Sequence, residues 1–411
     1  MKEVKISIFG DIMVEHPFYL QALTTDGADF MPSFAPLKEV IKDSDYVIGN
    51  LETPLAGENA GYVKDIVCFN SPDSLASVLK DVGFNFLATA NNHTLDRGFE
   101  GICRTIDVLD EVNIGHTGTC KDPEAEDTVF YTDVKGLKIA IINYTYGVNS
   151  DLVGWNMEGK ENCLNMLTRH DAPSRIRSMP PKKSDISFHD VESFIENIAG
   201  REITWLEEQR LKKLLHMSTA IIDDVVHMEE LEPAMQKIER EIRRAKTKSD
   251  LVLFYPHMGG QFNTVPGSYS LYVTSRAVQA GADAVFAAHS HTTQRGEMKG
   301  NVPCFYSLGN VSMYPAGDYV DMESLPQYGM AVHLYCSGKK IKKITFSLFK
   351  MLIDSNGKET IVPVDTLYRT LSGVREKSEL LFEITEVLKR VTGKEIYTIE
   401  NEYLFFEETE M

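Results

Sequence analysis

Six short apolar runs in this chain each end in a cluster of Asp, Glu, Asn or His side chains. They are VKISIFGD (Val4–Asp11), YVIGNLE (Tyr46–Glu52), FLATANNH (Phe86–His93), LVLFYPH (Leu251–His257), AVFAAHSH (Ala284–His291) and CFYSLGN (Cys304–Asn310). Each run is typical of a buried strand whose last residues emerge at one edge of a sheet. Open α/β sheets place ligand sites just beyond the carboxyl ends of their strands. Six such endings therefore predict one shared site, and their carboxylates, amides and imidazoles indicate a metal.

The rest of the pattern predicts an α/β layered fold. Strand-like runs alternate with helix-like segments over the first 145 or so residues, and the alternation resumes at Leu251. A helix is expected near 268–281. Met330–Cys336 and Ile341–Phe349 flank Gly338-Lys339-Lys340, a spacing that predicts a β-hairpin.

Residues from about 150 to 248 interrupt the alternation. Trp205–His216 and Glu229–Lys246 have the pattern of amphipathic, charge-rich helices, so we expect a helical insertion on the core. The predicted organisation is a main domain over residues 1–355 containing this insertion. A C-terminal extension over 356–411, packed on the core, should contain a helix at Glu376–Arg390.

The net charge of -18 argues against a nucleic-acid partner, because binding to a phosphate backbone needs clustered Lys and Arg. The six cysteines contain no CxxC pair, which is typical of reduced thiols in a chain of this length. No run reaches the roughly 18 apolar residues of a membrane span. The first residues do not have the pattern of a signal peptide, since Asp11 interrupts the apolar run. We therefore expect a cytoplasmic protein without a membrane anchor in this chain.

Among the polar clusters, His289-Ser290-His291 has the form of an HxH metal-binding pair. Alternate residues of an extended strand point the same way, so both imidazoles could face one site. Imidazole is a ligand for Zn, Fe, Ni or Cu. Without further support such a pair is more often two polar residues in a loop. His257 also follows a strand, where a lone histidine is usually structural.

The first two motifs add carboxylates. Asp11 follows Gly10, a residue that permits a tight turn and close approach of a ligand. Glu52 ends the second run. Taken singly, each acid could be an ordinary turn or loop residue.

Asn91-Asn92-His93 is more specific, because two amides and an imidazole directly after a buried strand need partners. Asp96, three residues after His93, could orient the imidazole ring and set its tautomer. It could also cap the helix predicted over 99–112, and the two roles are compatible.

In their order, these motifs resemble the ligand set of a binuclear metallophosphoesterase. The chain resembles the bacterial capsule-synthesis CapA family, which is linked to poly-γ-glutamate production and whose domain resembles calcineurin-like metallophosphatases. The resemblance covers roughly residues 4–350 and rests on seven motifs: GD at 10–11, GNLE at 49–52, ANNHTLDRG at 90–98, YTYGVN at 144–149, HMGG at 257–260, HSH at 289–291 and SLGN at 307–310. It implies a four-layer α-β-β-α sandwich with the site at the strand ends.

The resemblance also implies a role for each motif residue. Asp11 and His291 would bind one metal, while Asn92, His257 and His289 would bind the other. Glu52 would bridge the two. His93 would be the general acid that protonates the leaving oxygen, held by Asp96. One or two divalent ions are implied, with Mn, Fe or Zn expected.

Two positions depart from the phosphatase pattern. Met13 stands where the first motif of phosphatases has a metal-binding histidine. The second motif has Gly49-Asn50 in place of Gly-Asp, with the acid displaced to Glu52. The first metal position is therefore short of one ligand, and His16 could supply it only if the chain curls back.

Three functions are compatible with this pattern. The first is a metal-dependent hydrolase, preferentially a phosphoesterase, acting on a small-molecule or polymeric anionic substrate. The second is a non-catalytic accessory in capsule or poly-γ-glutamate biosynthesis that binds a metal or an anion. The third is a γ-glutamyl amide hydrolase, because metal-activated water can also attack a carbonyl carbon.

Overall fold

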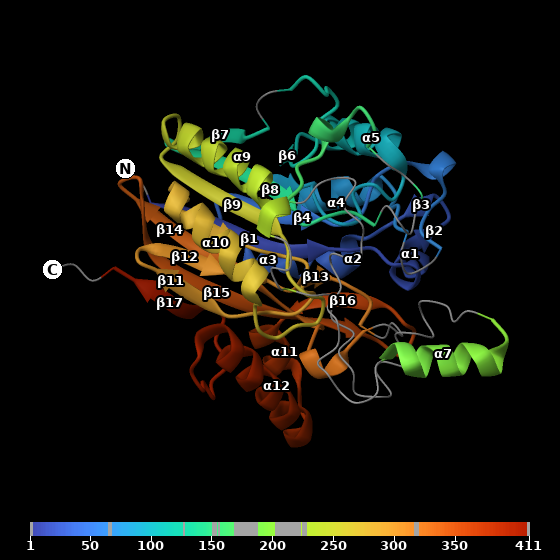
Figure 1. The fold of residues 1–411 in the computed structure, drawn as a ribbon. Coiled ribbons are helices and arrows are strands. Elements are labelled where there is room, and N and C mark those ends of the chain that lie inside the picture. Colours follow the sequence, from blue (N-terminus) through green and yellow to red (C-terminus); the bar gives the residue numbers. More distant parts are fainter. Residues whose placement is uncertain are drawn as a thin grey trace.

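A computed structural model describes residues 3–64, 68–125, 128–149, 154, 157–167, 188–201, 223, 228–315 and 320–408 (Figure 1). Two large β-sheets form its centre. The first has nine strands: β1 (Val4–Ile12), β4 (Tyr46–Leu51), β5 (Phe86–Ala88), β6 (Gly115–Thr117), β13 (Asn310–Ser312), β14 (Tyr328–Ser337), β15 (Lys340–Ile353), β16 (Glu359–Pro363) and β17 (Tyr403–Glu407). Its order is β16-β15-β14-β1-β4-β5-β6, with β13 beside β1 and β17 beside β15.

The second sheet has six strands in the order β11-β12-β10-β9-β8-β7. They are β7 (Phe130–Val134), β8 (Leu137–Thr145), β9 (Leu251–His257), β10 (Ala284–Phe286), β11 (Gly296–Lys299) and β12 (Val302–Phe305). A two-stranded ribbon of β2 (Leu23–Thr24) and β3 (Gly27–Ala28) lies apart from both. Strands β1, β4, β5 and β6 run parallel in the first sheet, and β8, β9, β10 and β12 run parallel in the second.

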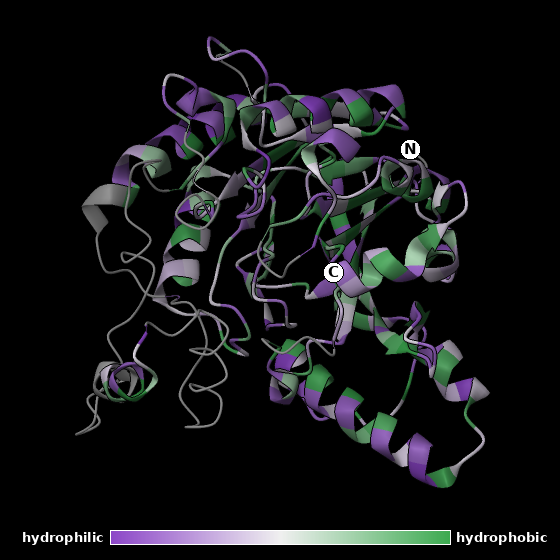
Figure 2. Cartoon of the chain, turned by 90° about the vertical axis from the view of Figure 1, so that its right-hand side faces the viewer, coloured by the Kyte–Doolittle hydropathy of each residue, from purple (hydrophilic) through white to green (hydrophobic). Residues whose placement is uncertain are grey.

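The helices are α1 (His16–Ala22), α2 (Met31–Phe34), α3 (Leu37–Val40), α4 (Ser74–Val82), α5 (Gly98–Glu111), α7 (Phe188–Ala199), α9 (Met228–Lys246), α10 (Ser268–Ala280), α11 (Val364–Thr370) and α12 (Val374–Thr392), with short 3-10 turns η1 (Glu58–Ala60), η2 (Glu161–Cys163) and η4 (Met322–Ser324). Hydrophilic and hydrophobic residues alternate along the peripheral helices (Figure 2). Both sheets contain parallel strands connected through helices, which confirms the α/β class expected from the sequence.

Apolar side chains sort into clusters that follow the strand period of two. Ile6 and Ile8 of β1 share one cluster with Ile139 and Ile141 of β8, so the two sheets pack against each other. On the other face of β8, Ala140 belongs to a second cluster with α9 and α10. A third cluster joins the first sheet to helices α1 to α4.

All six apolar runs contain or overlap strands, but they divide between the two sheets. The first three correspond to β1, β4 and β5, and the next two to β9 and β10. The last begins in β12 of the second sheet and ends at Asn310, the first residue of β13 in the first sheet. Two sets of parallel strands end near each other, and the polar clusters meet between two sheet edges.

Helix α9 lies inside the segment expected to be an insertion, and it packs on the second sheet. Its apolar positions Leu231, Met235, Ile238 and Ile242 recur every three or four residues and are buried. The expected helix Trp205–His216 lies outside the described residues.

Beyond residue 355, α12 buries Leu380, Ile384, Val387, Leu388 and Val391 in the cluster between the sheets. None of the described helices is both long enough and apolar enough to cross a membrane.

Candidate metal centre

The six residues expected to bind metal lie together at the ends of strands. Glu52 is central: its Oε1 lies 3.4 Å from His257 Nε2 and 3.8 Å from His291 Nε2. Asp11 lies on the other side of the same imidazoles, 3.6 Å from Nδ1 of each. Asn92 Oδ1 is 2.8 Å from His257 Nε2. The ring centroid of His289 lies 4.8 Å from that of His257.

Strand register brings these side chains together. In the parallel pairing of β1 with its neighbours, Asp11 lies opposite Asn50 of β4 and Asn310 of β13. The backbones of Gly10 and Gly309 approach each other closely here, since a Cβ atom added at Gly10 would lie 1.9 Å from the carbonyl oxygen of Gly309. Gly10 is thus required for the close approach of two backbones.

The HSH motif lies in a loop, not in a strand, because β10 already ends at Phe286. His289 and His291 have positive φ angles of 101° and 52°. Such conformations are uncommon for residues with a side chain and are frequent at functional sites, where the surroundings hold them. The imidazoles therefore reach one site through a left-handed loop, and not through the alternation of an extended strand.

Hydrogen bonds fix the orientation of this loop. The His289 N–H donates to Asp11 Oδ2 at 2.9 Å. His291 Nδ1 lies 2.9 Å from Asn310 Oδ1, and Asn310 Nδ2 donates back to the His291 carbonyl at 2.9 Å. With Nδ1 engaged by an amide oxygen, His291 Nε2 is left to face Glu52, which is how metal-binding histidines are usually oriented.

Burial strongly perturbs the ionisation of the acids and imidazoles in the site. Asp11 and Glu52 are completely buried. Burial raises the pKa of each carboxyl to about 8, and for Asp11 the neighbouring Glu52 adds to the effect. Neither Glu52 oxygen has a hydrogen-bond partner within the described part of the chain. Burial also lowers the pKa of His257 to about 4 and that of His291 to about 3, so both rings are neutral at pH 7, as metal ligands must be.

Two groups of side chains have ligand atoms close enough to share an ion. One is Asp11, Glu52 and His257, and the other is Glu52, His289 and His291. Glu52 belongs to both, as a bridging carboxylate would. The pairing differs from the one that the family resemblance implies, because His257 groups with Asp11 and His289 groups with His291. The donor set thus fits one or two divalent ions.

His93 lies outside both groups and has its own partners. Its Nδ1 is 2.7 Å from Asp96 Oδ2, which also accepts the Phe69 N–H at 2.6 Å. The ring stacks on Phe69 with centroids 4.0 Å apart. Burial alone would lower the pKa of His93, but Asp96 and Glu52 raise it to a value above its usual range.

Two residues that were not predicted as site residues also shape the site. Asn50 Nδ2 donates to Asp11 Oδ1 at 2.7 Å and lies 3.2 Å from His257 Nδ1. It therefore positions two candidate ligands at the place where the phosphatase motif has an acid. The ring of Tyr146 lies 4.4 Å from that of His289. Its only sequence signal is the motif at 144–149.

Met13 does not contribute to the polar site. Its side chain is buried in the apolar cluster that joins the first sheet to α1 to α4. His16 belongs to neither group of candidate ligands in the described chain. Among the described residues, neither Met13 nor His16 therefore supplies the ligand that the first motif of phosphatases provides.

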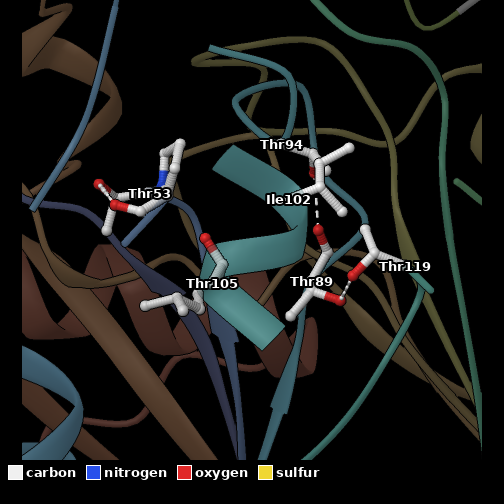
Figure 3. Close-up of a pocket in the computed structure, with 8 residues that line it drawn as sticks. Thr53, Thr89, Thr94, Ile102, Thr105 and Thr119 are labelled. Carbon is white, nitrogen blue, oxygen red and sulfur yellow. Dashed lines mark hydrogen bonds between the residues drawn. The ribbon is translucent and has the colours of Figure 1, made fainter. Parts of the chain in front are cut away.

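Residues that line a small pocket support the turn that carries Asn92 and His93 (Figure 3). Thr94 Oγ1 donates to the Thr89 carbonyl at 2.6 Å and accepts the Asn91 N–H at 2.8 Å. Thr89 Oγ1 lies 2.8 Å from Thr119 Oγ1. The lining residues are Leu51, Thr53, Pro54, Thr89, Thr94, Ile102, Thr105 and Thr119, none of them a predicted site residue. The threonines that line this pocket hold the turn in place, and none of them is a candidate metal ligand.

Comparison with known proteins yields relatives involved in capsule synthesis. Residues 5–314 match the family described as "Bacterial capsule synthesis protein PGA_cap". The chain is 24% identical over 307 residues to the "PGA biosynthesis protein CapA" of Bacillus subtilis, covering 74% of this chain and 62% of that protein. It is 22% identical over 312 residues to the "Capsule biosynthesis protein CapA" of Bacillus anthracis, covering 75% of this chain and 59% of that protein. The chain thus spans less than two thirds of the length of these relatives.

Among solved structures, a hypothetical protein from Thermus thermophilus aligns with 88% of this chain and 98% of its own, at 13% identity and a TM-score of 0.36. The family match covers well over half of the chain and includes every predicted site residue. The chain belongs to the bacterial capsule synthesis protein PGA_cap family.

Proposed function

We propose that this chain is a metal-dependent phosphoesterase of the capsule-synthesis family, acting on a small-molecule or polymeric anionic substrate. The observation that carries the proposal is the buried Glu52 carboxylate, which has no hydrogen-bond partner in the described chain and lies among Asp11 and the imidazoles. Among the described residues neither acid forms an ion pair with Lys or Arg, so both can be ionised near neutral pH only if a cation compensates their charge.

Asp11, Glu52, Asn92, His257, His289 and His291 would hold the metal, with Glu52 shared between two positions. Divalent ions in such a site activate water and stabilise the charge of a phosphoryl group. Asn50 and Asn310 orient Asp11 and His291 through the hydrogen bonds described above.

His93 would donate a proton to the leaving oxygen. Asp96 accepts the hydrogen of Nδ1, which leaves Nε2 as the proton-donating atom. The raised pKa of His93 favours the protonated form that a general acid needs. Because His93 is in neither ligand group, it can lose its proton without releasing the metal.

One observation favours a second candidate, a non-catalytic accessory that binds a metal or an anion. Met13 is buried in an apolar cluster where the phosphatase pattern has a ligand. A site with an incomplete ligand set could hold one ion and bind an anionic group without hydrolysing it. The relatives' names, which refer to PGA and capsule biosynthesis, are compatible with either function.

We extend the proposal to the architecture. Three of the apolar clusters support a four-layer α-β-β-α sandwich, because one lies between the sheets and one on the outer face of each. The division into a main domain over 1–355 and an extension over 356–411 stays a proposal as well.

The test is a hydrolysis panel run on the metal-depleted protein with Mn, Fe or Zn added back. It should include phosphomonoesters, phosphodiesters and γ-glutamyl peptides. Metal-dependent release of phosphate or of an alcohol supports the phosphoesterase. Cleavage of the peptides alone assigns the protein to the amide hydrolases, and tight metal binding without turnover on any substrate supports the accessory.

A further inference from the structure

The loop that follows the HSH motif is held from the C-terminal helix. Arg390 of α12 directs Nη1 toward this loop, where it donates to Thr292 Oγ1 at 2.6 Å and to the Thr293 carbonyl at 3.4 Å. The same nitrogen donates to the Ser324 carbonyl at 2.6 Å. Thr292 Oγ1 in turn donates to Ser324 O at 2.6 Å. One guanidinium thus joins α12, the loop beside His291 and the turn η4.

The hydrogen-bond partners of Arg390 are all uncharged. Within the described residues it forms no ion pair, and its acceptors are two backbone carbonyls and a hydroxyl. Its pKa is lowered to about 10, chiefly by burial, so it stays charged at neutral pH. Hydrogen bonds from a charged donor are stronger than neutral ones. A partly buried cation placed on neutral loop atoms is suited to holding that backbone.

The loop needs to be held. Thr292 and Thr293 have no exposed surface, and the two histidines on either side of Ser290 adopt left-handed backbone conformations. Such conformations persist only where the surroundings determine them. Asp11 and Asn310 fix the loop from the side of the site, and Arg390 fixes it from the opposite end, next to His291.

We propose that Arg390 is a positioning residue for the metal centre: by binding Thr292, Thr293 and Ser324 it keeps His289 and His291 oriented toward Glu52. This inference rests on the proposed metal site. It makes the C-terminal helix, which lies outside the family match that ends at residue 314, a part of that site.

The same helix offers a matched control. Glu383 anchors α12 through Lys350 Nζ at 2.6 Å and the hydroxyl of Tyr328, and neither of these partners belongs to the HSH loop. Glu383→Gln therefore weakens the docking of α12 without removing a contact to the loop. Arg390→Gln removes the charged donor that contacts the loop. Arg390→Lys keeps the positive charge but replaces the planar guanidinium and its several N–H donors with a single ammonium group.

The experiment is calorimetric titration of the metal-depleted full chain with Mn²⁺, alongside thermal unfolding of each metal-free variant. Arg390→Gln should weaken Mn²⁺ binding about 10- to 100-fold, the range typical of residues that orient metal ligands. Arg390→Lys should recover part of the loss. Glu383→Gln should lower the unfolding temperature but leave the affinity close to that of the wild type.

Equal Mn²⁺ affinity of Arg390→Gln and wild type would overturn the inference while leaving the metal site intact. An equal loss in Glu383→Gln would also overturn it, because helix docking would then account for the effect. A wild type that binds no metal removes the proposed function itself. If Arg390→Gln does not fold, Thr292→Val removes the same hydroxyl from the loop and should weaken binding to a similar extent; unchanged affinity in that variant contradicts the inference.

Discussion

Asp11 and Glu52 have a direct consequence for stability in the absence of metal. Their pKa values are raised to about 8, so the folded chain keeps protons that the unfolded chain has released. Stability must therefore fall as the pH rises toward 8. The lowered pKa values of His257 and His291 act in the opposite sense, but only below about pH 6.5, where free histidine titrates.

Between pH 6.5 and 8 we expect the metal-free protein to lose about 1–2 kcal/mol of unfolding free energy for each of the two carboxyls. The raised pKa of His93 acts in the same direction. Chemical denaturation at both pH values measures the change. Glu52→Gln should reduce the loss, and saturating Mn²⁺ should abolish it. A metal-free protein that becomes more stable over this interval contradicts the electrostatic description of the site.

His93 and His289 should differ when replaced. His93→Asn should lower turnover by about 10²–10⁴-fold with metal content near normal, because a general acid contributes on that scale. The loss should be smaller for nitrophenyl phosphates, whose leaving group needs little protonation. His289→Ala should lose metal and activity together. Metal analysis and kinetics of both variants provide the measurement, and an empty site in His93→Asn would make His93 a ligand.

A site residue could be predicted only where the neighbouring sequence carries a recognisable pattern. Asp11, Glu52, Asn92 and His257 could be identified because each follows an apolar run in the sequence. Asn50 and Arg390 could not, since their importance comes from contacts with residues 39 and 98 positions away, respectively.

At the scale of elements, strands were easier to place than the loops between them. The run Leu251–His257 coincides with β9, and the hairpin around Gly338 coincides with β14 and β15. The HSH segment shows why loops are harder. Its histidines converge through two positive φ angles, which depend on the hydrogen bonds of Asp11 and Asn310 and have no signature in an HxH pattern.

The contact between β1 and the start of β13 gives a prediction at this scale. In Gly10→Ala the new Cβ would lie 1.9 Å from Gly309 O, so the backbones must separate and Asp11 must move. We expect a loss of more than about 3 kcal/mol, at the upper end for overpacking, together with weaker metal binding. Gly300, with φ 63°, has open space around it.

Gly300→Ala is thus a control in which only backbone strain is added, at about 1–2 kcal/mol. Urea denaturation and Mn²⁺ titration of the two variants make the comparison. Similar, small losses in both would show that the close approach of Gly10 and Gly309 is not required.

For the whole molecule, the fold class could be predicted from the strand–helix alternation, but the residues alone did not show which strand belongs to which sheet. Apolar runs specify burial and not which strands pair, so the order of the strands within each sheet comes only from the structure. The sequence did not indicate that α9 packs on the second sheet, because most of its residues are charged and its buried apolar face is narrow.

The C-terminal segment should be indispensable for folding. Five apolar side chains of α12 are buried in the cluster between the sheets, and β17 pairs with β15. At about 1.5–3 kcal/mol for each buried side chain, their loss is comparable to the whole stability of a typical domain. A chain ending at Pro363 should therefore be insoluble or lack a cooperative unfolding transition by circular dichroism. Arg375→Ala, on the exposed face of the same helix, should unfold like the wild type.

The central claim is that one buried carboxylate, Glu52, organises a metal centre between the two sheets. The most direct test is Mn²⁺ titration of the metal-depleted wild type and of Glu52→Gln, a substitution that preserves shape and removes the charge. Because Glu52 belongs to both groups of candidate ligands, we predict one or two bound ions in the wild type and loss of all tight binding in the variant. Unchanged Mn²⁺ affinity in Glu52→Gln, or a wild type that binds no ion, would contradict the account.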